Sequence, residues 1–323
     1  MMSGRPPAAD AVGCGLSPLP LLVMSQLTIR HFTDPASPWD YSSEPARLRL
    51  NWRYGDAVSW EICLVVMTRS ADEFSARGAT PESLAATRGV LARRFGMPIN
   101  SERRTPLIST LPACRALAAV RRHAPNRLQS LLRRLRVIGL SEGEATDQPS
   151  VIMRAVVESG LDPSQVSTWM ADPMVDADVV ADMVAARDPS PAALALPERL
   201  TQTPEGIWRY TCPSYVMTNR EGVTVDVPGF QPVRTYEVAI ANLAPDIVAR
   251  AAPTDVAEVL DWAPYPLTTA EVAEICEIER ELAWDRLAAV ADIQPTAGGA
   301  FWSARTVARA PAKPTGSPRL ARS

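Results

Sequence analysis

Residues 34–40 (DPASPWD) combine a serine hydroxyl, carboxylates and prolines at the point where a predicted strand meets a predicted helix. Ser37 suits the position before a helix, because its hydroxyl can accept a hydrogen bond from a free backbone N–H. Pro38 fits the first helical turn, and the Asp40 carboxylate can reach back toward the cap. A well-capped helix start explains these residues but not the placement of Trp39. The alternative interpretation is a catalytic corner.

Other residue types that carry chemistry are few and scattered. The two histidines, His31 and His123, have no clustered ligands around them, which predicts that the protein uses no metal. The cysteines are odd in number and contain no CxxC pair, so they predict neither a disulfide framework nor a zinc site. They are Cys14, Cys63, Cys114, Cys212 and Cys276. We expect a cytoplasmic protein in which Cys63, Cys114 and Cys276 are core residues on apolar faces.

Charge gives no sign of a polyanionic partner. The 323 residues carry a formal net charge of −3, and no run approaches the ~20 apolar residues of a membrane span. We therefore expect neither nucleic-acid nor membrane binding. The densest charge run favours a solvated helix face, with guidance of an anionic substrate as the alternative. It consists of Arg121, Arg122, Arg127, Arg133, Arg134 and Arg136.

The elements around the corner form a recognisable order. Apolar, β-prone runs predict strands at 26–33 and 57–67, with a helix at 37–54 between them. Short joints make this a βαβ unit, so the two strands should be parallel and adjacent. Residues 79–187 then predict a series of amphipathic helices. At 207–227 the β character returns, and NREG favours a hairpin turn between two short strands.

Beyond the hairpin the chain is predicted to be mainly helical. A helix begins near Gln231, and two more lie between 268 and 292. Residues 267–302 resemble a winged helix, but acidic residues on the second helix would repel phosphates, so DNA binding is not expected. These acidic residues are Glu277, Glu279, Glu281 and Asp285. We divide the chain into a disordered leader (1–25), a first half (26–72), a helical insertion (73–205), a second half (206–250), a C-terminal helical extension (251–303) and a disordered basic tail (304–323).

Several segments, in order, resemble the DsbA-like family of thioredoxin-fold oxidoreductases. DPASPWDYSSEPARLRLNWRYGD is similar to the family's redox corner with its helix, and TCPSYVMTN to its cis-proline segment. PGFQP resembles the turn that opens the last helix, and GLSEG with GLDPSQV resembles the insertion. The matches span residues 27–250 and are most similar to the FrnE-like branch, which carries a similar C-terminal extension. The resemblance implies an α/β, thioredoxin-like fold with an all-helical insertion and a C-terminal helical extension.

The chain departs from that family at the redox site. Ser37 and Asp40 stand where the family has its two cysteines. A dithiol oxidase needs the first thiol at a helix N-terminus, where the thiolate is stabilised, and the second thiol to resolve the mixed disulfide. Because both thiols are missing, the sequence excludes CxxC redox chemistry.

A serine stands at this corner in two related groups of enzymes, the kappa-class glutathione transferases and the 2-hydroxychromene-2-carboxylate isomerases, whose corners DPASP resembles. There the serine hydroxyl donates to the sulfur of a bound glutathione. The resemblance thus implies that Ser37 holds the sulfur of a low-molecular-weight thiol, glutathione or mycothiol. It places the cofactor backbone at Cys212 and Pro213, and a carboxylate at Gln231. The other residues implied to bind the cofactor are Pro38, Trp39, Asp40 and Ser214.

Cys212 has two interpretations. The resemblance makes Pro213 the cis-proline, which would bring Cys212 opposite Ser37 as a relocated nucleophile. Alternatively, Cys212 is a small apolar residue packed beside Trp39, because free cysteines are among the most buried residue types.

Two classes of function remain open. The first is an enzyme that has lost its dithiol and acts on a small organic substrate through a bound thiol or Cys212, by oxidoreductase, transferase or isomerase chemistry. The second is a non-catalytic module that binds a ligand or partner in the same cleft. A homo-oligomer is left open.

Overall fold

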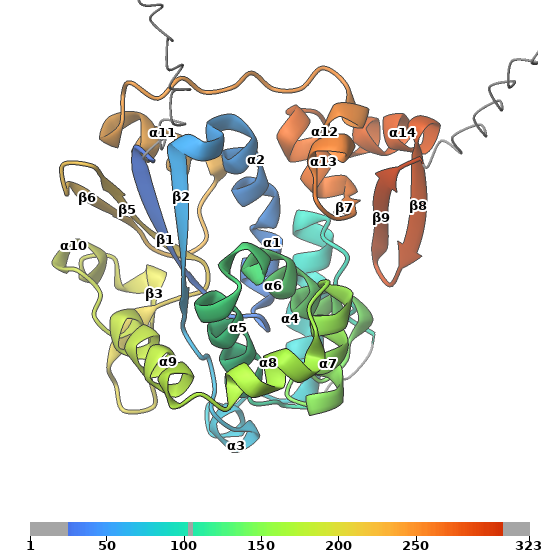
Figure 1. Cartoon of the computed structure of the whole chain (residues 1–323). Helices are drawn as coiled ribbons and strands as arrows, with labels where there is room; N and C mark the ends of the chain where they lie inside the picture. Colours follow the sequence, from blue (N-terminus) through green and yellow to red (C-terminus); the bar gives the residue numbers. More distant parts are fainter. Residues whose placement is uncertain (1–24, 103–105, 306–323) are drawn as a thin grey trace, which may run out of the picture.

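The computed structural model describes residues 25–102 and 106–305, so nearly all of the predicted leader and tail lies outside the described residues. The main sheet has four strands in the order β2-β1-β5-β6 (Figure 1). Its strands are β1 (Leu27–Thr33), β2 (Val58–Leu64), β5 (Ser214–Asn219) and β6 (Thr224–Val227). The sheet is therefore assembled from two parts of the chain that are far apart in sequence.

The predicted βαβ unit is confirmed, because β1 and β2 pair in parallel along their whole length. The single helix predicted over 37–54 is instead two helices, α1 (Pro38–Ser42) and α2 (Glu44–Tyr54). Pro45 explains the break. It has no N–H to continue the helical hydrogen bonds, and proline is tolerated only in the first turn of a new helix.

Along the sequence, a helical insertion separates β2 from β5 and β6, as the resemblance implies. Its core joins Leu117 and Leu131 to Leu64 of β2, so the insertion packs on the sheet edge. Its helices are α3 (Ala71–Ser75), α4 (Pro81–Phe95), α5 (Leu111–His123), α6 (Leu128–Arg136), α7 (Pro149–Glu158), α8 (Pro163–Met170), α9 (Pro173–Ala186) and α10 (Pro191–Leu194). Shorter helical turns are η1 (Gly55–Ala57), η2 (Pro125–Arg127), the π-helical η3 (Val137–Glu142) and η4 (Pro197–Arg199).

The chain returns to the sheet through a small hairpin of β3 (Leu200–Gln202) and β4 (Trp208–Tyr210). The boundary predicted between 205 and 206 falls inside this hairpin. The hairpin predicted at NREG is confirmed: β5 and β6 are antiparallel, and Gly222 in their turn has a φ of 81°. The following helix, α11 (Val233–Leu243), shares a hydrophobic core with α2 and the sheet.

The C-terminal extension contains a three-stranded sheet as well as the predicted helices, in the strand order β7-β9-β8. Its elements follow the order of a winged helix, as the resemblance of residues 267–302 suggests. They are α12 (Val256–Trp262), β7 (Leu267–Thr268), α13 (Thr269–Cys276), α14 (Arg280–Val290), β8 (Ala291–Thr296) and β9 (Gly299–Ala304). A purely helical extension is therefore an incomplete description. Strand β7 is only two residues long, and β8 is largely exposed, so neither has an apolar alternation that the sequence would reveal.

Buried arginines connect the three parts of the molecule. Arg133 of the insertion donates to Glu271 of α13, with Nη2 2.9 Å from Oε2. Arg49 of α2 pairs with Glu237 of α11 at 3.0 Å and with Glu274 of α13 at 3.1 Å. The insertion and the winged helix are thus fixed against the domain that carries the corner.

Candidate functional site

The corner brings together two residues that are 175 positions apart. Ser37 caps α1 and accepts a hydrogen bond from the Asp40 N–H, with Oγ 3.2 Å from N. Its hydroxyl also donates to the carbonyl oxygen of Cys212 at 3.3 Å. The Cys212–Pro213 peptide bond is cis, as the resemblance implies. Both the helix-cap interpretation and the predicted proximity of Ser37 to Cys212 are therefore confirmed.

A cavity of about 570 Å³ opens beside this corner, within the range of ~300–1,000 Å³ typical of small-molecule sites. Ser37, Pro38, Trp39 and Cys212 are among the residues that line it. Most of its wall is apolar: in addition to Trp39, it is formed by Met67, Phe74, Leu84, Phe95 and Phe230. The Trp39 ring lies edge-on to Phe95 and Phe230, with centroids 6.2 Å and 6.0 Å away. The 41% exposed Trp39 thus contributes an aromatic surface to the cavity.

The charged lining of the cavity is mainly positive. Arg94, Arg199 and Arg209 line it, and Glu198 is the acidic residue among the lining side chains. Arg209 is only 5% exposed, whereas Arg199 has a half-exposed side chain. A cavity with apolar walls and this charge balance favours an anionic ligand.

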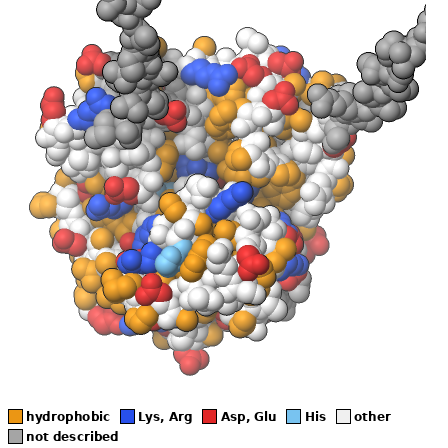
Figure 2. Space-filling model, viewed as in Figure 1, with side chains coloured by type: hydrophobic (Ala, Val, Ile, Leu, Met, Phe, Trp, Pro, Cys, Tyr) orange, Lys and Arg blue, Asp and Glu red, His pale blue; other side chains and the backbone are white. Residues whose placement is uncertain are grey.

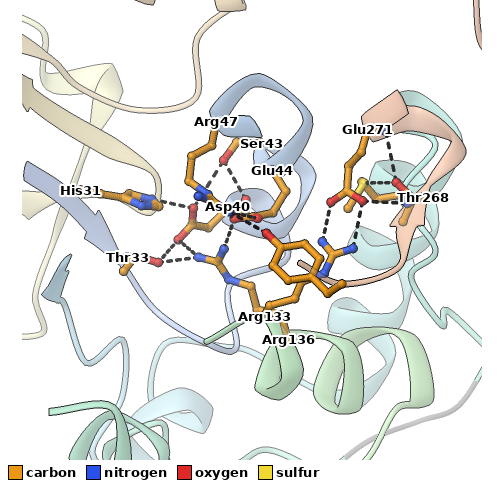
Figure 3. Close-up of polar contacts among 12 residues, drawn as sticks. His31, Thr33, Asp40, Ser43, Glu44, Arg47, Arg133, Arg136, Thr268 and Glu271 are labelled. Carbon is orange, nitrogen blue, oxygen red and sulfur yellow. Dashed lines mark hydrogen bonds and ion pairs between the residues drawn. The ribbon is translucent and has the colours of Figure 1, made fainter. Parts of the chain in front are cut away.

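Asp40 does not line the cavity and lies in a buried polar network (Figure 3). Its carboxylate lies 2.9 Å from Nε2 of His31 and 2.6 Å from Nη2 of Arg136, and it also accepts a hydrogen bond from Thr33. Burial alone would raise the pKa of Asp40, but the Arg136 charge and His31 hold it below its usual value. With 0% exposure, Asp40 is not available to a cofactor, so the implied cofactor role is wrong.

Glu44 and Arg47 complete this network. Arg136 also pairs with Glu44, whose second oxygen accepts from Nη2 of Arg47 at 2.7 Å. Burial works against the ionised form of Glu44, but Arg47 and Arg136 outweigh it and place the pKa far below the ordinary range. Arg136 therefore stabilises two buried carboxylates at once, one on α1 and one on α2.

The prediction that the arginine run lies on a solvated helix face is only partly correct. Arg122 is exposed and pairs with Asp178, and Arg127 is also exposed. Arg133 and Arg136 are 5% and 1% exposed, and both form buried ion pairs. The two lie three residues apart on α6 and share its buried face with Leu residues.

Cys212 is a buried thiol in an unfavourable setting for a nucleophile. Burial raises its pKa well above the ordinary value, and the nearby charges of Asp34 and Asp40 raise it further. Its side chain is 8% exposed and packs in a core with Phe32 and Tyr210. The structure therefore favours the apolar interpretation over a relocated nucleophile.

Three other residues implied to bind the cofactor do not line the corner cavity. Pro213 is buried and is not among the lining residues. Ser214 is fully buried, and its hydroxyl accepts from the Gly229 N–H at 2.9 Å. Gln231 donates its side-chain amide to the Pro228 carbonyl and lines a neighbouring cavity of about 770 Å³. The burial of Ser214 contradicts its implied cofactor role, whereas the implied role of Gln231 stays a prediction.

The described cysteines besides Cys212 are Cys63, Cys114 and Cys276, and all three are buried, as predicted. Within residues 25–102 and 106–305, no three or more His, Cys, Asp or Glu side chains are grouped to hold a metal ion. The helices described there also include none with the length and apolar character needed to cross a membrane.

No protein-family model matches this chain, and no curated protein matches it. Among solved structures, a provisionally assigned protein disulfide isomerase from Nitrosomonas europaea superposes with a TM-score of 0.53 at 13% identity, over 68% of this chain and 100% of that one. A probable DsbA oxidoreductase from Streptomyces coelicolor superposes with a TM-score of 0.50 at 19% identity, over 71% and 94% of the two chains. The fold is therefore a thioredoxin-like fold of the DsbA type with a helical insertion.

Sequence reasoning missed the residues that give the cavity its character. Arg209 lies between Trp208 and Tyr210 in a predicted strand, where a buried arginine has no distinct pattern. Phe95 and Phe230 come from the end of α4 and from the PGF turn, and they meet only in the folded chain, with centroids 4.6 Å apart. For the buried network, the sequence does contain a usable signal. Arg136 follows Leu132 and Leu135 on the apolar side of a helix, and this position indicates a buried arginine.

Proposed function

We propose that this protein binds a small organic molecule in the corner cavity and does not exchange disulfides through a dithiol. One observation carries the proposal. The position that forms the redox centre in DsbA-type enzymes here holds a buried Ser37 and an ion-paired Asp40, beside an apolar cavity large enough for a ligand. The solved structures named above support the fold. The site residues support the proposal that the cavity binds a small molecule and that no dithiol exchanges disulfides there.

The first candidate for the bound molecule is a low-molecular-weight thiol, glutathione or mycothiol, that acts on a small substrate by oxidoreductase, transferase or isomerase chemistry. Ser37 and Cys212 line the cavity, so a thiol sulfur placed there would meet the Ser37 hydroxyl. The positive lining would attract the carboxylates of glutathione. The proposal covers a cytoplasmic protein with no nucleic-acid or membrane partner, and a homo-oligomer is compatible with it.

The second candidate is a non-catalytic binding module. A specific observation favours it: the Ser37 hydroxyl already donates to Cys212 and accepts from the Asp40 N–H. To act on a thiol, Ser37 must give up the contact with the Cys212 carbonyl. Because the Ser37 hydroxyl is already hydrogen-bonded to the backbone, binding of a ligand by the cavity walls alone is the simpler alternative.

A calorimetric titration with reduced glutathione separates the two candidates. If Ser37 holds the sulfur, Ser37→Ala should weaken glutathione binding about tenfold or more, and should cost about 1 kcal/mol of stability for the lost cap. Ser190→Ala is the matched control, because Ser190 caps α10 and likewise donates to a partner, Asp226. Mycothiol is titrated in the same way.

Two other outcomes of the titration would count against the thiol candidate. Equal affinity of the parent and Ser37→Ala for the thiol would make Ser37 a helix cap only and would favour the binding module. A parent that binds neither thiol would remove the thiol candidate altogether.

A further inference from the structure

Five arginines are buried in the described part of the chain, and one of them differs from the others. Arg47, Arg49, Arg133 and Arg136 each form an ion pair with at least one glutamate or aspartate. Arg209 is 5% exposed, yet no carboxylate among the described residues lies within ion-pair distance of it. Its assigned hydrogen bond runs from Nη1 to the Tyr210 carbonyl oxygen at 3.0 Å.

The carboxylates of Asp34 and Glu73 attract Arg209 from beyond ion-pair distance, and Glu73 is already paired with Arg77 at 3.2 Å. Asp34 lies close enough to attract Arg209, but its carboxylate accepts from the Ala36 and Met67 N–H groups, each at 2.9 Å. Burial lowers the pKa of Arg209, and the neighbouring Arg77 lowers it further. A nearly buried charge without an ion-pair partner is costly, and no Arg209 nitrogen is both fully buried and without a hydrogen bond, so its free N–H groups are accessible to an anion from outside the chain.

Arg209 lines the corner cavity together with Cys212 and the apolar side chains described above. We propose that the cavity takes an amphipathic monoanion, a carboxylate or sulfonate on an apolar chain or ring, with the anionic group on Arg209 and the apolar part against Trp39, Phe95 and Phe230. This inference rests on the proposed function, because it names the class of ligand for the same cavity.

The geometry accounts for both halves of such a ligand. A guanidinium offers up to five N–H donors, and a carboxylate or sulfonate accepts two of them in parallel. Arg94, which also lines the cavity, adds to the positive potential, whereas Arg199 is paired with Glu198 at 3.8 Å. Met67, Phe74 and Leu84 would cover an acyl chain and remove it from water, which is favourable at roughly 25 cal/mol per Å² of buried apolar surface.

The test is a titration of the full chain with octanoate, octane-1-sulfonate, octan-1-ol and octylamine, which share one apolar chain and differ in the head group. We expect the two anions to bind at least tenfold more tightly than the alcohol, and the amine most weakly. Arg209→Met should lower octanoate affinity at least tenfold while leaving octan-1-ol affinity unchanged, and Arg209→Lys should retain part of it. Arg30→Met, which removes an exposed arginine paired with Glu61 outside the cavity, should change nothing.

Folding of the variants is checked by circular dichroism and melting temperature. Because Arg209 has no buried carboxylate partner, Arg209→Met should melt close to the parent. Equal affinities of the parent for octanoate and octan-1-ol, or full octanoate affinity in Arg209→Met, would overturn the inference. A parent that binds glutathione but neither anion would overturn it and leave the proposed function standing. A parent that binds the anions but no thiol would support it and remove only the thiol candidate.

Discussion

Replacing Arg136 with methionine is expected to lower the free energy of unfolding by about 3–5 kcal/mol. The methionine fills much of the same volume but leaves the buried Asp40 without its cation and deprives Glu44 of one of two. The measurement is urea unfolding at pH 7, followed by circular dichroism. Arg122→Met is the control, because its partially exposed pair with Asp178 should be worth at most about 1 kcal/mol.

A double variant separates the ion pair from the loss of side-chain packing. Asp40→Leu combined with Arg136→Met removes both charges, and it should be less destabilising than the sum of the single changes by about 0.5–3 kcal/mol. Additive losses, or a loss below about 1 kcal/mol for Arg136→Met alone, would mean that the network does not hold the corner in place.

The second large effect is expected on acidification. The folded-state pKa values of Asp40 and Glu44 lie below their ordinary values, despite burial, because of Arg136, His31 and Arg47. A depressed carboxyl pKa stabilises the fold above the unfolded value of about 4, and this stabilisation is lost as the pH falls toward the folded-state value. Each such group contributes a slope of up to about 1.4 kcal/mol per pH unit in that window.

Glu44→Gln isolates one of these contributions. At pH 7 the parent should be more stable than Glu44→Gln, and the gap should narrow as the pH falls from about 4.5 to 2.5. Urea unfolding at several pH values measures the gap. Asp34 does not disturb this comparison, although burial raises its pKa and gives it the opposite pH dependence, because it is present in both proteins. A gap that stays constant with pH would show that Glu44 is not held ionised by its arginines.

The fold could be predicted from the sequence largely because its signals are local or ordered along the chain. The βαβ unit follows from two β-prone runs with a capped helix between them, and the hairpin follows from the NREG turn. The errors in the predicted helices and strands also have local causes. Pro45 divides the predicted helix, and the sheet of the winged helix depends on a two-residue strand that has no pattern of its own.

The candidate site was less predictable because its properties arise from tertiary contacts. Ser37 and Cys212 were correctly placed together, since both belong to recognisable segments. The role of Asp40 was not predictable: the position of Arg136 on the apolar side of α6 indicates a buried arginine, but not that its partner is Asp40, 96 residues away. The burial of Arg209 was not predicted for the same reason. A sequence shows that an arginine is present, but not that it is buried without a carboxylate.

We propose that the corner of this DsbA-type fold does not exchange disulfides through a dithiol. The most direct measurement is the initial rate of insulin disulfide reduction by dithiothreitol, with the parent protein and with Cys212→Ala, against a buffer blank and a thioredoxin as positive control. We expect the parent and the variant both to follow the blank, because Ser37 and Asp40 carry no thiol and the Cys212 thiol is buried with a raised pKa. Acceleration by the parent above the blank would contradict the proposal, and loss of that acceleration in Cys212→Ala would identify Cys212 as the nucleophile.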